Sequence, residues 1–260
     1  MSRTVAILLM CGACAAAQPR FSAPLVGLAR DAKGHLRAVH GVSGNFMLRD
    51  AISGGVDAWA FDGNFGLVKT DRELLTLGAN GTVVRRRPAP QTEAVLDAVS
   101  AFFPKTAELW QAGPEGYSKV SIEPGAIAGR VIALGATDAH EVQFAVCRDK
   151  QLWLLSINAV TGALAHERVP GGAIAEQACH ATGAGSLVVM PDRMLLATGR
   201  AILIQTTAGV ERRIAISASH AARAGEHWVE VEGPDGPARM IRITSEGENV
   251  YLLPAPKERQ

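Results

Sequence analysis

The densest local group of side chains that could do chemistry lies in the segment GATDAHE, residues 135–141. Asp138, His140 and Glu141 place two carboxylates and one imidazole in a single short stretch. Carboxylates and imidazoles bind metal ions and transfer protons, so this group is a candidate metal or catalytic site. A polar loop between two strands is the alternative, and it is the favoured interpretation because apolar runs flank the segment.

Motifs that define a complete catalytic or cofactor site do not occur in the sequence. The seven histidines are scattered, without the HxxxH or HExxH spacing of a helical metal site. GxSxG, the Walker A motif and GxGxxG, which carry a hydrolase nucleophile or cradle phosphates, are also missing. We therefore expect no cofactor and no metal, although residues far apart in a ring can still meet on its axis.

The first 17 residues have the pattern of a signal peptide. Arg3 precedes an apolar run over residues 5–13, and Ala15 and Ala17 stand at positions −3 and −1 of a cut before Gln18. The sequence thus predicts export to the periplasm or beyond the cell. The mature chain of 260 − 17 = 243 residues would form a single domain, 18–260. A lipoprotein cut before Cys14 is the alternative.

The predicted mature chain has no net formal charge. The sequence has 26 Lys and Arg and 25 Asp and Glu, and removal of Arg3 leaves 25 − 25 = 0. A neutral exported chain is not expected to bind nucleic acid or an anionic membrane surface. No apolar run reaches the roughly 20 residues of a spanning helix. We expect a monomer that binds a protein or a small molecule of unknown identity.

Two cysteines, Cys147 and Cys179, remain after removal of the predicted signal peptide. An oxidising compartment would permit one disulfide between them. That bond would close a loop of about 30 residues and contribute on the order of 3–4 kcal/mol in the chain-entropy model. Two buried free thiols are the alternative, and the sequence leaves both open.

Short β-strands separated by turn residues account for most of the chain. Runs rich in Val, Ile, Leu and Thr alternate with Gly, Asp, Asn and Pro. They predict four strands in each of three segments, 56–88, 129–170 and 185–217. Asn80 and Gly81 lie between two apolar runs and predict a hairpin turn, because both residue types tolerate a positive φ.

Three further segments have weaker strand signals. About three strands are expected in 99–125 and again in 226–256, and two in 24–41. Val95, Val99 and the two phenylalanines that follow share one face at helical spacing, so a helix is the alternative there. Pro104 favours strand.

The strand segments repeat at a regular interval. Leu75 and Leu154 occupy similar places in two of them and lie 154 − 75 = 79 positions apart, which is two units of about 40. Four strands per 40–45 residues is the signature of a propeller blade. We predict an all-β fold, a small β-propeller of about five blades, with six as the alternative. The N-terminal strands would complete the final blade and close the ring.

The segment WLLSINAVTGALAHERV, residues 153–169, joins an apolar strand to an outer strand through a Thr-Gly turn. It resembles the repeat of quinoprotein-like and lactonase-like propellers. Residues 24–256 resemble secreted bacterial β-propeller proteins that are largely uncharacterised. The resemblance implies a propeller fold. The chain is too short, and too poor in tryptophan, for the quinone-binding enzymes.

Basic residues are densest at Arg85, Arg86 and Arg87, with a second run at Arg212 and Arg213. Both runs fall in predicted fourth strands, which form the outer rim of a propeller. Charge at the rim protects exposed strand edges from pairing with other chains. An anion-binding patch is the alternative.

The function predicted from these patterns is an exported, non-catalytic binding or scaffolding propeller. It rests on a ring architecture in which no catalytic constellation is visible, so the fold itself supplies no specific function. The alternative is a hydrolase or lyase with its active site at the central axis. That enzyme would need polar side chains converging at one mouth of the ring.

Overall fold

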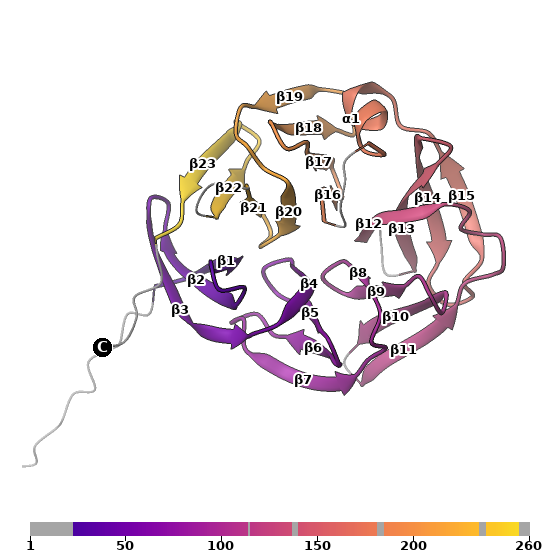
Figure 1. The fold of residues 1–260 in the computed structure, drawn as a ribbon, viewed down its shortest axis with the longest axis horizontal. Helices are drawn as coiled ribbons and strands as arrows, with labels where there is room; N and C mark the ends of the chain where they lie inside the picture. Colours follow the sequence, from indigo (N-terminus) through magenta and orange to yellow (C-terminus); the bar gives the residue numbers. More distant parts are fainter. Residues whose placement is uncertain (1–22, 114, 137–139, 181–184, 234–237, 255–260) are drawn as a thin grey trace, which may run out of the picture.

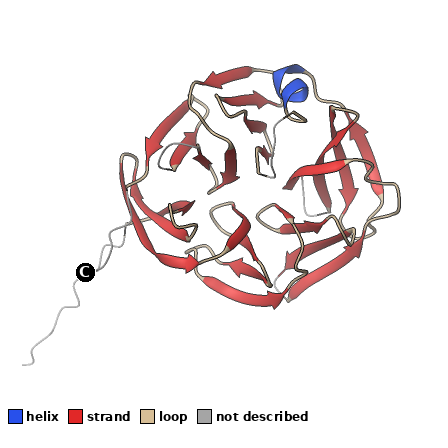
Figure 2. Ribbon diagram, viewed as in Figure 1, coloured by secondary structure: helices blue, strands red, loops and turns tan. Residues whose placement is uncertain are grey.

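The computed structural model describes residues 23–113, 115–136, 140–180, 185–233 and 238–254. Within them the chain forms β-strands in six antiparallel sheets arranged around a common axis (Figure 1). Strands make up nearly all of the regular structure, with one short helix at the periphery (Figure 2). The fold is a β-propeller.

The first sheet has three strands and the other five have four each, in chain order from the inside outwards. The first sheet consists of β1 (Leu25–Arg30), β2 (Leu36–Val42) and β3 (Asn45–Ser53). The second consists of β4 (Val56–Phe61), β5 (Gly66–Thr70), β6 (Glu73–Leu77) and β7 (Val83–Pro88). The third consists of β8 (Val95–Leu96), β9 (Ser100–Phe103), β10 (Glu108–Gly113) and β11 (Gly116–Ser121).

The remaining three sheets complete the circle. The fourth consists of β12 (Arg130–Ala136), β13 (Glu141–Arg148), β14 (Gln151–Asn158) and β15 (Leu164–Arg168). The fifth consists of β16 (Leu187–Met190), β17 (Arg193–Ala197), β18 (Ile202–Thr206) and β19 (Glu211–Ile214). The sixth consists of β20 (His220–Arg223), β21 (Trp228–Glu232), β22 (Arg239–Ile243) and β23 (Glu248–Leu252).

The hairpin between β6 and β7 lies where the sequence predicts it. Gly81 has a φ of +72°, which glycine adopts without steric cost. The Asn80 Oδ1 atom accepts a hydrogen bond from the Thr82 backbone N–H at 3.1 Å and fixes the turn. The outer strand β7 then exposes alternate residues, so the arginines at 85–87 lie on the rim as expected.

Five inner strands surround the axis. β4, β8, β12, β16 and β20 contact one another in that order, and β20 contacts β4. The three-stranded sheet is also part of the circle of sheets, but its inner strand β1 does not belong to this ring of five strands. It packs on the sixth sheet instead, where β1 contacts β21 and the Leu28 backbone N–H donates to the Ala224 carbonyl at 3.0 Å. Apolar side chains fill the spaces between sheets; for example, Phe102 and Phe144 meet edge to face with ring centroids 5.1 Å apart.

The structure refines the predicted blade count. It has six sheets rather than about five, and 95–103 forms strands β8 and β9 rather than a helix. The predicted completion of the final blade by N-terminal strands is not found among the described residues. Instead β20–β23 form a four-stranded sheet alone, and the N-terminal strands build their own sheet because β3 adds a third strand.

A short helix, α1 (Gly172–Gln177), covers the outer part of the space between the fourth and fifth sheets. It contacts β14, β17 and β18. A disulfide between Cys147 on β13 and Cys179, just after the helix, has a Cα–Cα distance of 5.4 Å. This helix was not predicted, because six residues are too few for a recognisable helical period. No helix in the described part of the chain is long and apolar enough to cross a membrane.

Candidate functional site at the axis of the ring

A cavity of about 200 Å³ lies on the axis, lined by the inner strands of the five four-stranded sheets. Its wall is mainly small and branched apolar side chains, including Ala58, Ala60, Ile132, Leu134 and Val188. These residue types suit inner strands because neighbouring strands crowd together at the axis. The wall can pack against an apolar molecule but offers it few polar partners.

The two ends of the cavity can be told apart from the chain direction. Each four-stranded sheet starts with its inner strand and is antiparallel throughout, so each outer strand ends beside the start of the next inner strand. All five inner strands therefore run the same way. The strand starts bring Asp57, Glu93 and His220 to one end, which we call the open mouth. The strand ends bring Asp97 and Arg223 to the other, which we call the closed end.

Carboxylates at the open mouth face solvent. The Asp57 side chain is 53% exposed, Glu93 is exposed, and His220 is half-buried. Beside them lies a buried cation, Lys69, whose side chain is only 1% exposed. With His220 neutral, Asp57, Glu93 and Lys69 carry a formal charge of −2 + 1 = −1.

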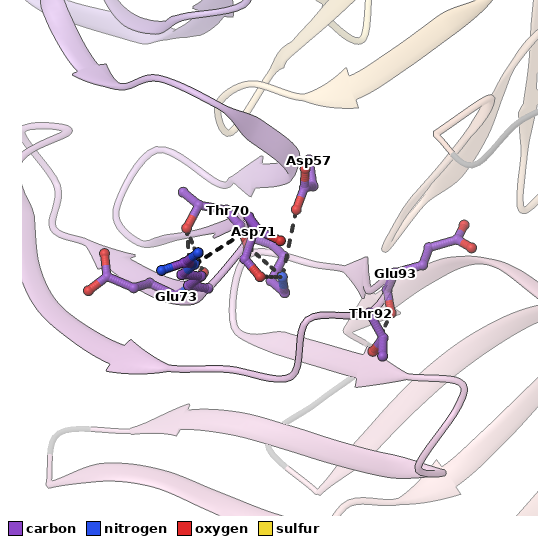
Figure 3. Close-up of polar contacts among 8 residues, drawn as sticks. Asp57, Thr70, Asp71, Glu73, Thr92 and Glu93 are labelled. Carbon is purple, nitrogen blue, oxygen red and sulfur yellow. Dashed lines mark hydrogen bonds and ion pairs between the residues drawn. The ribbon is translucent and has the colours of Figure 1, made fainter.

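The Lys69 ammonium is held by three oxygen atoms. Its Nζ donates to the Thr70 carbonyl and to the Asp71 carbonyl, the latter at 3.2 Å, and lies 3.7 Å from Asp57 Oδ2. Figure 3 shows Asp57 pointing toward the Thr70–Asp71 turn, with Glu93 in the segment that precedes β8 of the neighbouring sheet. A buried ammonium is costly unless its donors find acceptors. This arrangement therefore fixes Lys69 and orients Asp57 at the rim.

The closed end holds a buried ion pair. Arg223 Nη1 lies 3.7 Å from Asp97 Oδ1, with side chains 15% and 3% exposed. Asp97 follows β8 and Arg223 ends β20, and these two strands lie on opposite sides of β4. The pair therefore connects two sheets that are not neighbours. Two nearby donors, Arg223 Nε and Trp59 Nε1, are buried without a hydrogen-bond acceptor among the described residues. A ligand carrying an acceptor could satisfy them.

A second buried carboxyl group lies where the three-stranded sheet meets the sixth sheet. Glu230 is fully buried, and its Oε1 accepts a hydrogen bond from the Arg30 backbone N–H at 3.1 Å. Burial raises the pKa of Glu230 well above its usual range, and repulsion from Glu232 raises it further. The Arg30 side chain lies closer to Glu232, with Nε 3.9 Å from Oε1. Glu230 accordingly keeps its proton to a higher pH than an ordinary glutamic acid does.

Of the three candidate residues predicted from GATDAHE, the structure describes His140 and Glu141. Asp138 lies outside the described residues. His140 is exposed, and Glu141 begins β13 with its Oε2 4.0 Å from His166 Nδ1. Among the described residues no group of three His, Cys, Asp or Glu side chains could hold a metal ion.

His166 also shares a hydrogen bond with Ser156, whose Oγ lies 2.9 Å from His166 Nε2. His166 on β15 thus contacts both Ser156 on β14 and the Glu141 carboxylate on β13, a set of residue types that also occurs in nucleophilic triads. Ser156 is only 1% exposed, so its hydroxyl is closed to a substrate. The contact instead satisfies a buried hydroxyl and ties β14 to β15.

The axial residues escaped the sequence analysis because they are distant in the chain. Asp57, Glu93, Asp97, His220 and Arg223 belong to three different sheets, and no local motif connects them. Only the register of the inner strands brings them together. A charged residue at the edge of an apolar inner-strand run, as in VDAWAF (56–61), is the signal that could have marked them.

No family model matches this sequence, and no curated protein matches it. Solved structures are similar at the level of the fold. PorZ, a surface component of the type-IX secretion system of Porphyromonas gingivalis, is 14% identical with a TM-score of 0.44; the match covers 89% of this chain, which spans only 31% of PorZ.

Two further structures show the same distant likeness. Virginiamycin B lyase from Staphylococcus aureus is 11% identical with a TM-score of 0.42, over 89% of this chain and 84% of the lyase. A protein of unknown function from Bacteroides caccae is 11% identical with a TM-score of 0.49, over 89% and 92%. At these identities the likeness concerns the fold alone.

Proposed function

We propose that this chain is an exported binding protein that holds a small ligand in its axial cavity without transforming it. The ligand has a cationic group, an apolar body and a hydrogen-bond acceptor at the opposite end. The observation that carries the proposal is the change in polarity along the cavity. Exposed carboxylates stand at the open mouth, apolar walls follow, and unsatisfied buried donors lie within.

The cavity dimensions limit the ligand to a small molecule. About 200 Å³ is less than the roughly 300–1,000 Å³ of pockets that take drug-sized molecules. From Asp57 to Ala60 the strand rises about 10 Å at roughly 3.3 Å per residue. An extended six-carbon amine with a terminal amide has a similar reach, so 6-aminohexanamide is a suitable probe. Hexanamide, which lacks the amine, is its matched control.

Isothermal titration calorimetry with these two compounds tests the proposal. Glu93→Gln removes one exposed carboxylate from the open mouth, and we expect it to weaken 6-aminohexanamide about tenfold, the worth of one charge-assisted contact. Glu176→Gln, an exposed change on helix α1 outside the cavity, should leave the affinity unchanged. Equal affinity for the two compounds, or equal effects of the two variants, would contradict the proposed site.

A hydrolase or lyase acting at the axis is the second candidate function. The observation that favours it is His220, an imidazole that lines the open mouth together with Asp57 and Glu93, since such a group could act as a general base. The same probe separates the two functions. Ammonia released from 6-aminohexanamide by the wild type, and not by His220→Gln, would establish amide hydrolysis. Unchanged probe recovered after prolonged incubation supports binding alone.

The proposal that the protein is exported rests on residues 1–17. Their charged start, apolar run and small residues at the cut support cleavage before Gln18. The intact mass of protein from a periplasmic fraction tests this. A mass that begins at Gln18 supports secretion, a lipid-modified Cys14 supports the lipoprotein alternative, and an uncleaved cytoplasmic chain contradicts export.

A further inference from the structure

A second cavity, of about 410 Å³, lies between the fourth and fifth sheets and shares Val189 with the lining of the axial cavity. The loop 170–172 forms part of its rim, together with the β18–β19 connection. Its apolar wall includes Leu154, Val189 and Met194. The volume is within the range of pockets that take small molecules. We call it the interblade cavity.

The interblade cavity contains a buried acceptor that is not used. Gln205 is 7% exposed, and its Nε2 donates to the Gly171 carbonyl at 2.7 Å. A carbonyl can only accept, so this bond fixes which end of the amide is nitrogen. The opposite atom, Oε1, is buried with no hydrogen-bond donor among the described residues. An unsatisfied buried acceptor costs free energy unless a ligand or water donates to it.

A cation without a carboxylate partner stands at the rim. Arg168, the last residue of β15, is exposed and forms no ion pair with the described residues, so all five of its N–H donors are open to an anion. The other charged lining residues are already engaged. Asp192 binds Arg193, and Glu211 Oε1 accepts from the Ala173 backbone N–H at 2.8 Å.

The conformation of the rim loop requires glycine at position 172. Gly172 has a φ of +86°, and a Cβ atom there would lie 2.9 Å from Gln205 Nε2 and would also collide with the Glu211 carboxylate. A side chain at position 172 would therefore disturb both polar groups that hold the loop. The helix that follows is anchored by the Cys147–Cys179 disulfide.

We propose that the interblade cavity binds an α-amido carboxylate: a carboxylate for Arg168, an amide N–H for the free oxygen of Gln205, and an apolar side chain for the Leu154 and Met194 wall. An N-acyl amino acid and the C-terminal residue of a peptide share this chemistry. Arg168 and Gln205 do not line the axial cavity, so this proposal does not depend on the function proposed there.

Calorimetry with N-acetyl-leucine tests the proposal. We expect saturable binding that weakens at least tenfold when the carboxylate is replaced, in N-acetyl-leucine methylamide, or when the amide N–H is removed, in 4-methylpentanoate. These comparisons change only the ligand, so they do not depend on a variant that folds. No saturable binding up to about 10 mM, or equal affinities for the acid and the methylamide, would overturn the proposal.

Protein variants then locate the binding. Arg168→Gln should remove the advantage of N-acetyl-leucine over its methylamide, whereas Arg213→Gln, an exposed arginine of β19 outside the cavity, should preserve it. Gln205→Met should remove the higher affinity of N-acetyl-leucine relative to 4-methylpentanoate. Its melting temperature shows whether the variant is folded. An Arg168→Gln variant that binds like the wild type would place the compound elsewhere and overturn the site.

A tetrapeptide ending in leucine distinguishes the two sources of the ligand. Tighter binding than N-acetyl-leucine supports a peptide C-terminus, and equal or weaker binding supports a free acyl amino acid. Either result requires the carboxylate. Failure of 6-aminohexanamide to bind would not contradict this proposal. The two probes have opposite charges, and each cavity is tested with its own protein variants.

Discussion

The two ends of the axial cavity carry ion pairs with the same separation but different surroundings. Asp57 and Lys69 are 3.7 Å apart at the open mouth, and Asp97 and Arg223 are 3.7 Å apart at the closed end. The carboxylate is 53% exposed in the first pair and 3% exposed in the second. Water screens the first pair and stabilises its acid, whereas the second pair depends on its partner. The distance between charges therefore does not decide what each pair contributes.

This difference assigns a role to each end. The Asp57 carboxylate at the open mouth can exchange water for a ligand cation at little cost. The Asp97–Arg223 pair is buried, and its Arg223 Nε has no hydrogen-bond acceptor among the described residues. Four changes in the protein test this comparison, and they follow in order of decreasing effect on stability.

Loss of the disulfide has the largest expected effect, because the bond restricts a long loop of the unfolded chain. Replacing Cys147 and Cys179 with serine opens a loop with a sequence separation of 32, and we expect unfolding free energy to fall by about 3–4 kcal/mol. Urea unfolding followed by tryptophan fluorescence measures this. Two titratable thiols in the oxidised chain that begins at Gln18, or an unchanged midpoint, would contradict the bond and its role.

Arg223→Met tests the closed end. It leaves the Asp97 carboxylate buried without its guanidinium, and we expect a loss of about 3 kcal/mol in unfolding free energy. Arg213→Met, at an exposed position, is the control and should change stability little. The double variant Asp97→Leu/Arg223→Met should recover part of the loss. A single variant as stable as the wild type would show that the pair is not essential to the fold.

Glu230 is a buried carboxyl group that differs from Asp97 in its partner. A backbone N–H donates to it, whereas Asp97 pairs with a guanidinium. Its pKa is raised in the folded state, so the folded protein holds a proton that the unfolded chain has lost. Its contribution is present below the ordinary pKa of about 4.5 and is lost as pH rises through the raised value. Stability should fall by up to about 1.4 kcal/mol per pH unit within that window.

Glu230→Gln should remove this slope and make the protein more stable than the wild type at the alkaline end. Urea midpoints of both proteins across the pH range measure the effect. Glu226→Gln, an exposed change in the preceding turn, is the control. Parallel pH profiles for the wild type and Glu230→Gln would contradict a raised pKa.

Asp57→Asn should have the smallest effect on stability. Its carboxylate is half in water, and Lys69 keeps its two carbonyl acceptors, so we expect a loss of no more than about 1 kcal/mol. The variant should nevertheless bind 6-aminohexanamide with lower affinity than the wild type does. A loss as large as that of Arg223→Met would remove the distinction between the two ends.

The sequence predicted the sheets well where turn residues punctuate apolar runs. Segments 56–88, 129–170 and 185–217 became β4–β7, β12–β15 and β16–β19. The Asn80–Gly81 turn was correct because its signal is local. The sequence missed strands where the pattern is short or polar: β8 has two residues, and the exposed strand β3 carries an Arg-Asp pair, at Arg49 and Asp50, without clear alternation.

The axial site could not be predicted for a physical reason. Glu93 and Arg223 are 130 positions apart in the chain, by 223 − 93, and only ring closure brings both to one cavity. Local density pointed instead to GATDAHE, whose His140 is exposed at a strand connection. In this propeller, the polar residues of the axial site come one or two at a time from three different sheets. The spacing of residues within a local motif therefore does not predict that site.

A crystal structure of the protein soaked with 6-aminohexanamide tests the central claim most directly. We expect the probe in the axial cavity, with its ammonium beside Glu93 and Asp57 and its amide oxygen toward Arg223 Nε or Trp59 Nε1. An empty axial cavity at saturating probe, or a probe with its ammonium at the closed end, would contradict it.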